Sequence, residues 1–157
     1  MGCCAAPSTH SNQTSCPKCG QAGKKVDEVT LKSLLGSSAL ERRSETAHRF
    51  CSTPSCPVVY FGISESFTTD EVTVPVFQKQ PGPGTPLCYC FGIKIEDVQK
   101  DALTTDQPSI EQRIQSLVKA DRCACELRNP QGSCCLGDVK EVIRAARKTR
   151  DRELAGA

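Results

Sequence analysis

Two cysteines flank one tyrosine in PLCYCFG, residues 86–92. Thiols separated by one residue in a tight loop can both turn toward a single metal centre, but they do not comfortably form a disulfide with each other. Cys88 and Cys90 are therefore metal ligands, halves of two separate disulfides, or redox thiols. The other cysteines of the chain are needed to decide among these roles.

The chain has twelve cysteines among 157 residues and only 4% aromatic residues, so a conventional apolar core would be thin. This cysteine density indicates either the disulfides of a secreted protein or the metal sites of an intracellular one. The N-terminal stretch MGCCAAPSTHSNQTS lacks the basic and apolar segments of a secretory signal, and no apolar run reaches the length of a membrane span. We therefore expect a cytoplasmic metal-binding protein without membrane insertion; a disulfide-stapled secreted protein is an alternative.

The stretch CPKCG, residues 16–20, has the form of a zinc knuckle, in which backbone amides can point at both sulfurs. A second pair of cysteines follows after 31 intervening residues, giving the pattern C-x2-C…C-x4-C. Four thiolates suit one tetrahedral zinc ion, and such a closed site leaves no position for a catalytic water. The predicted zinc ligands are Cys16, Cys19, Cys51 and Cys56.

Two other interpretations of this first set stay open. The thiols could be buried without a ligand, or CPKC could be a redox motif, although the βαβ context of thioredoxin-like motifs is missing. His48 lies close to Cys51 in the sequence and could replace a ligand, but a lone histidine is more often a surface residue.

A second set of cysteines begins with Cys88 and Cys90, just before a predicted helix. After 32 further residues comes a dense group in CACELRNPQGSCC, which ends where the last predicted helix begins. A helix N-terminus offers free amides and a positive dipole end, and both stabilise thiolates. Two such loops describe a four-sulfur site, for which a second zinc and a [2Fe–2S] cluster, with two thiolates per iron, both fit. The distant candidates are Cys123, Cys125, Cys134 and Cys135.

The first half of the chain favours strands and turns. Residues 26–35 alternate loosely, whereas residues 57–62 and 71–78 are richer in β-branched side chains and are expected to pair as a hairpin. Pro75 then places the second of these strands at an edge. Residues 40–48 form either a short helix or a charged loop.

The stretch QPGPGTP, residues 80–86, breaks the composition, and the chain turns helical after it. Apolar spacing predicts helices over residues 93–103, 109–120 and about 136–150. Ser109 is the expected N-cap of the middle helix, with Gln112 completing a capping box. The predicted fold class is α+β, divided into a flexible tail (1–14), a zinc-binding β-rich domain (15–80), a linker (81–86), a helical domain (87–150) and a second tail (151–157).

Four motifs occur in order along residues 15–146, namely CPKCG, FCSTPSCPVVYF, PLCYCFG and CELRNPQGSCCLG. In this order they resemble the N-terminal domain of CopZ-type copper chaperones. The run from CYC to CLGDVKEVI is also similar to bacterioferritin-associated ferredoxin-like [2Fe–2S] domains. The resemblance implies one Zn2+ site in the first half and one [2Fe–2S] cluster in a helical, ferredoxin-like second half.

The resemblance implies Cys88, Cys90 and Cys135 as cluster ligands, since the residues after Cys135 continue the helix of the family motif. The fourth ligand is either Cys123 or Cys125, because this chain has C-A-C and a longer insertion where the family has C-x2-C. We favour Cys125, which lies nearer the turn that must fold back to Cys135. The other cysteines of the dense group would then be spare thiols beside the cluster.

CopZ-type chaperones continue into a heavy-metal-associated domain with an M-x-C-x-x-C copper site. This chain ends at RELAGA and its only methionine is Met1, so copper delivery is not expected to carry over. The resemblance implies instead one-electron transfer linked to copper or other soft-metal homeostasis, with a redox or metal-transfer protein as partner. Spare thiols, including Cys3 and Cys4 in the tail, could bind copper or mercury.

Two histidines, His10 and His48, are too few for a catalytic set, so we expect no enzyme. The net charge of +2, and C-terminal basic residues interleaved with acids, give no basis for nucleic-acid binding. The main alternative function is an all-zinc structural interaction module without a redox role.

Overall fold

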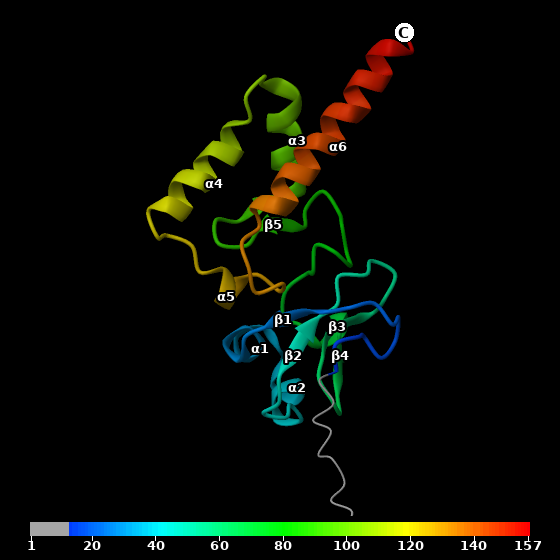
Figure 1. Ribbon diagram of the computed structural model, residues 1–157. Helices are drawn as coiled ribbons and strands as arrows, with labels where there is room; N and C mark the ends of the chain where they lie inside the picture. The colour runs from blue at the N-terminus through cyan, green and yellow to red at the C-terminus, as the bar shows by residue number, and fades with distance from the viewer. Residues whose placement is uncertain (1–12) are drawn as a thin grey trace, which may run out of the picture.

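The computed structural model describes residues 13–157. Its first half contains a small antiparallel sheet with two short helices, and its second half is largely helical (Figure 1). The predicted α+β fold class is confirmed. Within residues 13–157, no helix is both long enough and apolar enough to cross a membrane.

The four strands of the sheet follow one another in the order β1-β2-β3-β4, and each pairs with its neighbour in antiparallel fashion. Strand β3 is buried along its whole length, because apolar side chains lie on both of its faces. Cys51 follows β2 directly and Cys56 precedes β3, so the sheet holds both ends of the connecting loop. The strands are β1 Lys24–Val26, β2 His48–Phe50, β3 Val58–Phe61 and β4 Ser66–Thr68.

Two helices occupy positions that the sequence pattern did not predict. Residues 26–35 are not an extended strand, because only the end of β1 lies in them and helix α1, Glu28–Leu34, follows. Helix α1 buries Thr30, Leu31 and Leu34, which lie on one face at helical spacing. Helix α2, Ser37–Glu41, then leads into a charged loop before β2.

The predicted hairpin between residues 57–62 and 71–78 is wrong in its second strand. Strand β3 pairs instead with β4, across the tight turn at residues 62–65. The short 3₁₀ helix η1, Thr69–Glu71, follows β4 directly. After it, Val72 forms only an isolated bridge with Leu35. Residues 71–78 alternate in hydrophobicity because Val72 and Val76 pack into the core from a loop.

The second half has its own apolar core, formed where helices α3, α4 and α6 pack against the small β5–β6 hairpin. Val98, Ile114 and Val139 are fully buried in it, one from each of the three long helices. Helix α6 extends five residues past the expected end at Arg150 and projects beyond the other helices (Figure 1). The elements are β5 Pro86–Cys88, β6 Ile93–Lys94, α3 Ile95–Thr104, α4 Ser109–Lys119, α5 Cys125–Arg128 and α6 Leu136–Ala155.

Helix α4 begins differently from the expected capping box. Its N-cap residue is Pro108, and Ser109 is its first helical residue. The carboxylate of Asp101, from α3, accepts hydrogen bonds from the Ile110 amide at 2.9 Å and the Ser109 hydroxyl at 2.7 Å. One free amide at the start of α4, that of Ile110, is thus satisfied by a neighbouring helix and not by a local capping box.

Candidate metal centres

The structure brings the first set of cysteines together into one compact group. The sulfurs of Cys16, Cys19, Cys51 and Cys56 all lie within 4.8 Å of one another. Cys16 is 3.8 Å from Cys56 and Cys19 is 3.6 Å from Cys51, measured between sulfurs. These distances match the edges of a tetrahedron of thiolates around one zinc ion, since Zn–S bonds are about 2.3 Å long.

Backbone hydrogen bonds fix the knuckle that carries the first two thiols. The Gly20 amide donates to the Cys16 carbonyl at 2.9 Å, and the Cys16 amide donates to the Gln21 carbonyl at 2.8 Å. Gly20 has a φ of 74°, a left-handed conformation that glycine adopts without strain. The Cys51 amide donates to the Val59 carbonyl at 2.8 Å, which ties the second pair to β3.

Two polar side chains reach these sulfurs, and the spacing of the cysteines gave no sign of them. The Lys79 ammonium donates to the Thr53 carbonyl at 2.6 Å and lies 3.6 Å from the Cys51 sulfur. The Thr53 hydroxyl lies 3.4 Å from the Cys19 sulfur. A sequence signal existed only for Thr53, which stands inside the loop CSTPSC between two ligands.

The thiols of the first set differ in acidity. Burial raises the pKa of Cys16, and it raises the pKa of Cys56 to about 12. Contact with the Thr53 hydroxyl and a backbone hydrogen bond lower the pKa of Cys19 to about 6. A cation bound here must displace protons from the buried thiols, so the site favours an ion that binds thiolate strongly.

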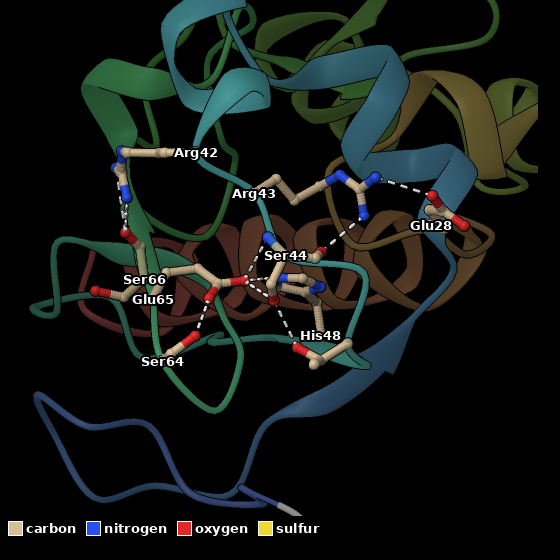
Figure 2. A network of polar contacts seen from close by, with 9 residues as sticks. Glu28, Arg42, Arg43, Ser44, His48, Ser64, Glu65 and Ser66 are labelled. Carbon is tan, nitrogen blue, oxygen red and sulfur yellow. Dashed lines mark hydrogen bonds and ion pairs between the residues drawn. The ribbon is translucent and has the colours of Figure 1, made fainter.

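His48 is not a replacement ligand for zinc, because its imidazole is paired with Glu65. It is buried, with 3% of its side chain exposed, and its Nε2 lies 2.7 Å from Glu65 Oε1. Figure 2 shows Glu65 at the centre of a polar network that also receives the hydroxyl groups of Ser44 and Ser64. The expectation of a surface histidine is wrong, because His48 is a buried partner of a carboxylate.

The second set of cysteines meets as two pairs. The sulfurs of Cys90 and Cys125 lie 3.6 Å apart, and the thiols of Cys88 and Cys135 lie in the same buried cluster, near enough to shift each other's pKa. Each pair therefore joins one cysteine of the CYC loop to one cysteine of the distant group. The Ala124 amide also donates to the Cys90 sulfur, at 3.3 Å.

The starts of two helices position the distant members of these pairs. Cys125 is the first residue of α5, and Cys135 is the N-cap of α6. Cys123 is half-buried and Cys134 is exposed, and neither sulfur is among the hydrogen-bonded sulfur pairs of residues 13–157. Cys3 and Cys4 lie outside the described residues.

Contact between thiols also divides the second set by acidity. The neighbouring Cys135 thiol lowers the pKa of Cys88 to about 7, whereas the Cys88 thiol and burial raise the pKa of Cys135. Burial and the contact with Cys90 raise the pKa of Cys125. None of the ten cysteines in residues 13–157 forms a disulfide.

The two sets differ in shape. Within the described part of the chain, the first set is the one group of three or more metal-type side chains whose ligand atoms gather this closely. The fold and this site define a zinc-binding α+β domain.

Comparisons with known proteins agree with this class. Residues 13–73 match the family described as the CopZ zinc binding domain. The copper chaperone CopZ of Archaeoglobus fulgidus is 27% identical over 121 residues, a match that covers 76% of this chain and 57% of that protein. The crystal structure of its N-terminal domain superposes with a TM-score of 0.69 and 24% identity, over 82% of this chain and 96% of that domain.

The family match covers residues 13–73, and the four cysteines that gather there form a Cys4 site for zinc. The chain spans 57% of the length of CopZ, which is a copper chaperone. The link to copper therefore comes through a distant relative.

Proposed function

We propose that Cys88, Cys90, Cys125 and Cys135 hold a [2Fe–2S] cluster. The observation that carries the proposal is the meeting of four thiols in two pairs, one at a sulfur distance of 3.6 Å and one whose thiols are near enough to shift each other's pKa. A [2Fe–2S] cluster needs two thiolates on each of two irons, whereas one zinc ion needs four equidistant sulfurs. The pairs predict that each iron would take one ligand from the CYC loop and one from the distant group.

The surroundings of these thiols suit an anionic centre. Cys88, Cys125 and Cys135 are buried, which would exclude water from the centre. The Ala124 amide already points at Cys90. Leu136 begins the 20-residue helix α6 directly after Cys135, so the positive end of the helix dipole faces the site.

From this site we infer a one-electron carrier. When bound, a four-thiolate [2Fe–2S] cluster supplies one-electron chemistry. We propose that the protein exchanges electrons with a redox or metal-transfer partner in the handling of copper or another soft metal such as mercury, in a reducing compartment such as the cytoplasm. We propose no enzymatic activity, because neither cysteine set leaves a position for a reacting substrate.

A second candidate is an all-zinc interaction module. A groove of about 800 Å³ between α4 and α6 is lined by Lys140, Arg144 and Arg147 and could receive an anionic partner. However, Glu111 and Asp151 line the same groove, and Arg147 donates to three backbone carbonyls at the end of α3. This groove is therefore a weaker basis for function than the second cysteine set.

Anaerobic purification followed by metal analysis tests the proposal. We expect two irons, two sulfides and one zinc per chain, with the visible absorption of a [2Fe–2S] protein. A colourless protein that contains two zincs and no iron would refute the redox function and support the interaction module.

Neighbouring cysteines provide matched controls for the ligand assignment. Cys125→Ser and Cys135→Ser should each lose the cluster, because each removes one of four ligands. Cys123→Ser and Cys134→Ser should keep it, since neither sulfur takes part in the two pairs. Cluster loss in Cys123→Ser with retention in Cys125→Ser would assign the fourth ligand to Cys123.

A further inference from the structure

The segment that joins Cys125 to Cys135 is anchored to the zinc-binding half. Tyr60, fully buried on β3, donates its hydroxyl to the Pro130 carbonyl at 2.6 Å. The Lys24 ammonium, on β1, donates to the Ser133 hydroxyl, also at 2.6 Å. The loop between two proposed cluster ligands is therefore held from strands of the zinc-binding sheet.

The same loop lies close against the first half of the chain. Gly132 has a φ of 67°, and a Cβ atom built on it would approach the Thr30 hydroxyl to 3.1 Å and Val26 to 3.4 Å. Glycine suits this position because it adopts a positive φ without strain and because it has no Cβ atom to crowd its neighbours. Pro130 is also buried, so its carbonyl needs the donor that Tyr60 provides.

The CYC loop is anchored in a similar way by the tyrosine inside it. The Tyr89 hydroxyl donates to the Pro75 carbonyl at 2.6 Å and accepts a hydrogen bond from the Phe77 amide at 3.0 Å. The segment that receives these bonds continues to Lys79, which contacts Cys51 of the zinc site. Tyrosine hydrogen bonds thus join each cysteine loop of the second centre to the rest of the chain. Tyr60 donates one bond to the loop before α6, and Tyr89, within the CYC loop, makes two bonds to residues 75–77.

We propose that Tyr60 and Tyr89 are positioning residues, which hold the two loops of the second cysteine centre against the zinc-binding half. Tyr60 fixes the position of the loop between Cys125 and Cys135, and Tyr89 fixes the position of the loop that carries Cys88 and Cys90. These are the two tyrosines of the chain. The inference rests on the proposed [2Fe–2S] site for its effect on a cluster, and on the tyrosine hydrogen bonds alone for its effect on the thiols.

Alkylation of zinc-loaded, iron-free protein tests the positioning without any cluster. Tyr60→Phe and Tyr89→Phe remove only a hydroxyl, and mass spectrometry of the labelled peptides follows each cysteine. Each lost hydrogen bond corresponds to a rise of about three- to tenfold in the exposure of the freed loop, and Tyr89→Phe loses two such bonds. Tyr60→Phe should speed labelling of Cys125 and Cys135, and Tyr89→Phe should speed labelling of Cys88 and Cys90.

The cluster-loaded proteins give a second readout, which a purely structural role would not move. Each variant should shift the reduction potential and the electron paramagnetic resonance g values of the reduced cluster while keeping one zinc per chain. Thr104→Ala is the matched control, because it also deletes a hydroxyl, one bonded to the Lys100 carbonyl at 2.8 Å within α3. It should change neither labelling nor spectra.

The outcomes separate this inference from the proposed function. Unchanged labelling of all four cysteines in both tyrosine variants, or equal acceleration of all four together with zinc loss, would overturn the positioning role. If the wild-type protein holds no iron, the cluster proposal falls, and the pattern of alkylation still decides whether the tyrosines position the loops.

Discussion

Glu65 is the residue on which the turn between β3 and β4 depends. Its carboxylate accepts hydrogen bonds from the Ser44 amide at 3.1 Å and the Ser64 hydroxyl at 2.6 Å, and it contacts His48 at 2.7 Å. Burial raises its pKa, but these hydrogen bonds outweigh burial and bring the pKa to about 2. The charged carboxylate thus joins the turn to the loop after α2 (Figure 2).

Replacing Glu65 with glutamine should therefore remove a pH-dependent part of stability. A carboxylate whose pKa is lower in the folded state stabilises the protein above its unfolded pKa of about 4.3, and this contribution is lost as the pH falls toward 2. We expect Glu65→Gln to cost about 2 kcal/mol of unfolding free energy at pH 6 and about half as much at pH 3. Urea unfolding of both proteins across this range measures the difference.

The exposed Glu45 lies in the same loop and serves as the control. Glu45→Gln should follow the wild-type curve at every pH. Because all three proteins lose zinc from the same cysteines in acid, only the difference between the curves is informative. A constant gap between Glu65→Gln and wild type from pH 6 to pH 3 would contradict the assignment.

At the zinc site, we expect Lys79 to have the largest effect on zinc binding among the residues that are not ligands. Its ammonium lies 3.6 Å from the Cys51 sulfur and so offsets the negative charge of the thiolates. Loss of such an outer partner typically weakens metal binding by about ten- to a hundredfold, and we expect Lys79→Gln to release zinc about tenfold faster.

Zinc transfer to a chromogenic chelator measures this rate. Lys32→Gln is the control, because Lys32 is largely exposed and pairs only with Glu28 on α1. Equal release rates for Lys79→Gln and wild type would show that the Lys79 ammonium does not stabilise the bound thiolates.

The sequence predicted the candidate sites better than it predicted their supports. Cysteine spacing was sufficient to propose which thiols gather, because C-x2-C and C-x-C geometry is set locally. Lys79, Tyr60 and Tyr89 were missed, since their contacts join segments far apart in the chain. Such contacts depend on tertiary packing, and no local pattern encodes them.

At the scale of elements, periodicity succeeded where a segment is long and failed where it is short. Helices α3, α4 and α6 contain at least ten residues each, so an apolar stripe repeats several times along them. Helix α1 has seven residues, and its VDEVTLKSLL sequence fits strand alternation equally well. The strand predicted at residues 71–78 failed because its apolar residues are buried from a loop.

The start of α4 gives a direct test of local against tertiary capping. Asp101→Ala removes the carboxylate that bonds to Ile110 and Ser109, and should cost about 1 kcal/mol of stability. Gln112→Ala, at the position of the sequence-predicted capping box, should change stability by no more than about 0.5 kcal/mol. Thermal unfolding compares them, and a larger loss in Gln112→Ala would restore the local capping box.

At the scale of the whole molecule, two apolar cores meet at a border that several hydrogen bonds cross. One core lies between the sheet and the helices α1 and α2, and the other lies among α3, α4 and α6. The zinc cysteines form a third buried cluster with Val58 and Phe61 of β3. Tyr60, Lys24 and Gln78 cross the border by hydrogen bonds to the loop before α6.

This division predicts that zinc removal affects the two halves unequally. Structural zinc contributes about 10 kcal/mol or more in small zinc domains, comparable with the total stability of a typical domain. The zinc-binding half should therefore unfold when a chelator removes zinc from iron-free protein. The helical core holds no zinc ligand, so α3 and α6 should remain largely folded.

Hydrogen exchange followed by mass spectrometry resolves the two halves. Amides of β2 and β3 should lose protection on chelation, whereas those of α3 and the first part of α6 should keep it. Adding zinc back should restore the protection of the strands. If all of these amides lost protection together, the contacts across the border would make the molecule one cooperative unit. Removing the hydrogen bonds of Tyr60 and Tyr89 would then be the first way to separate the two halves.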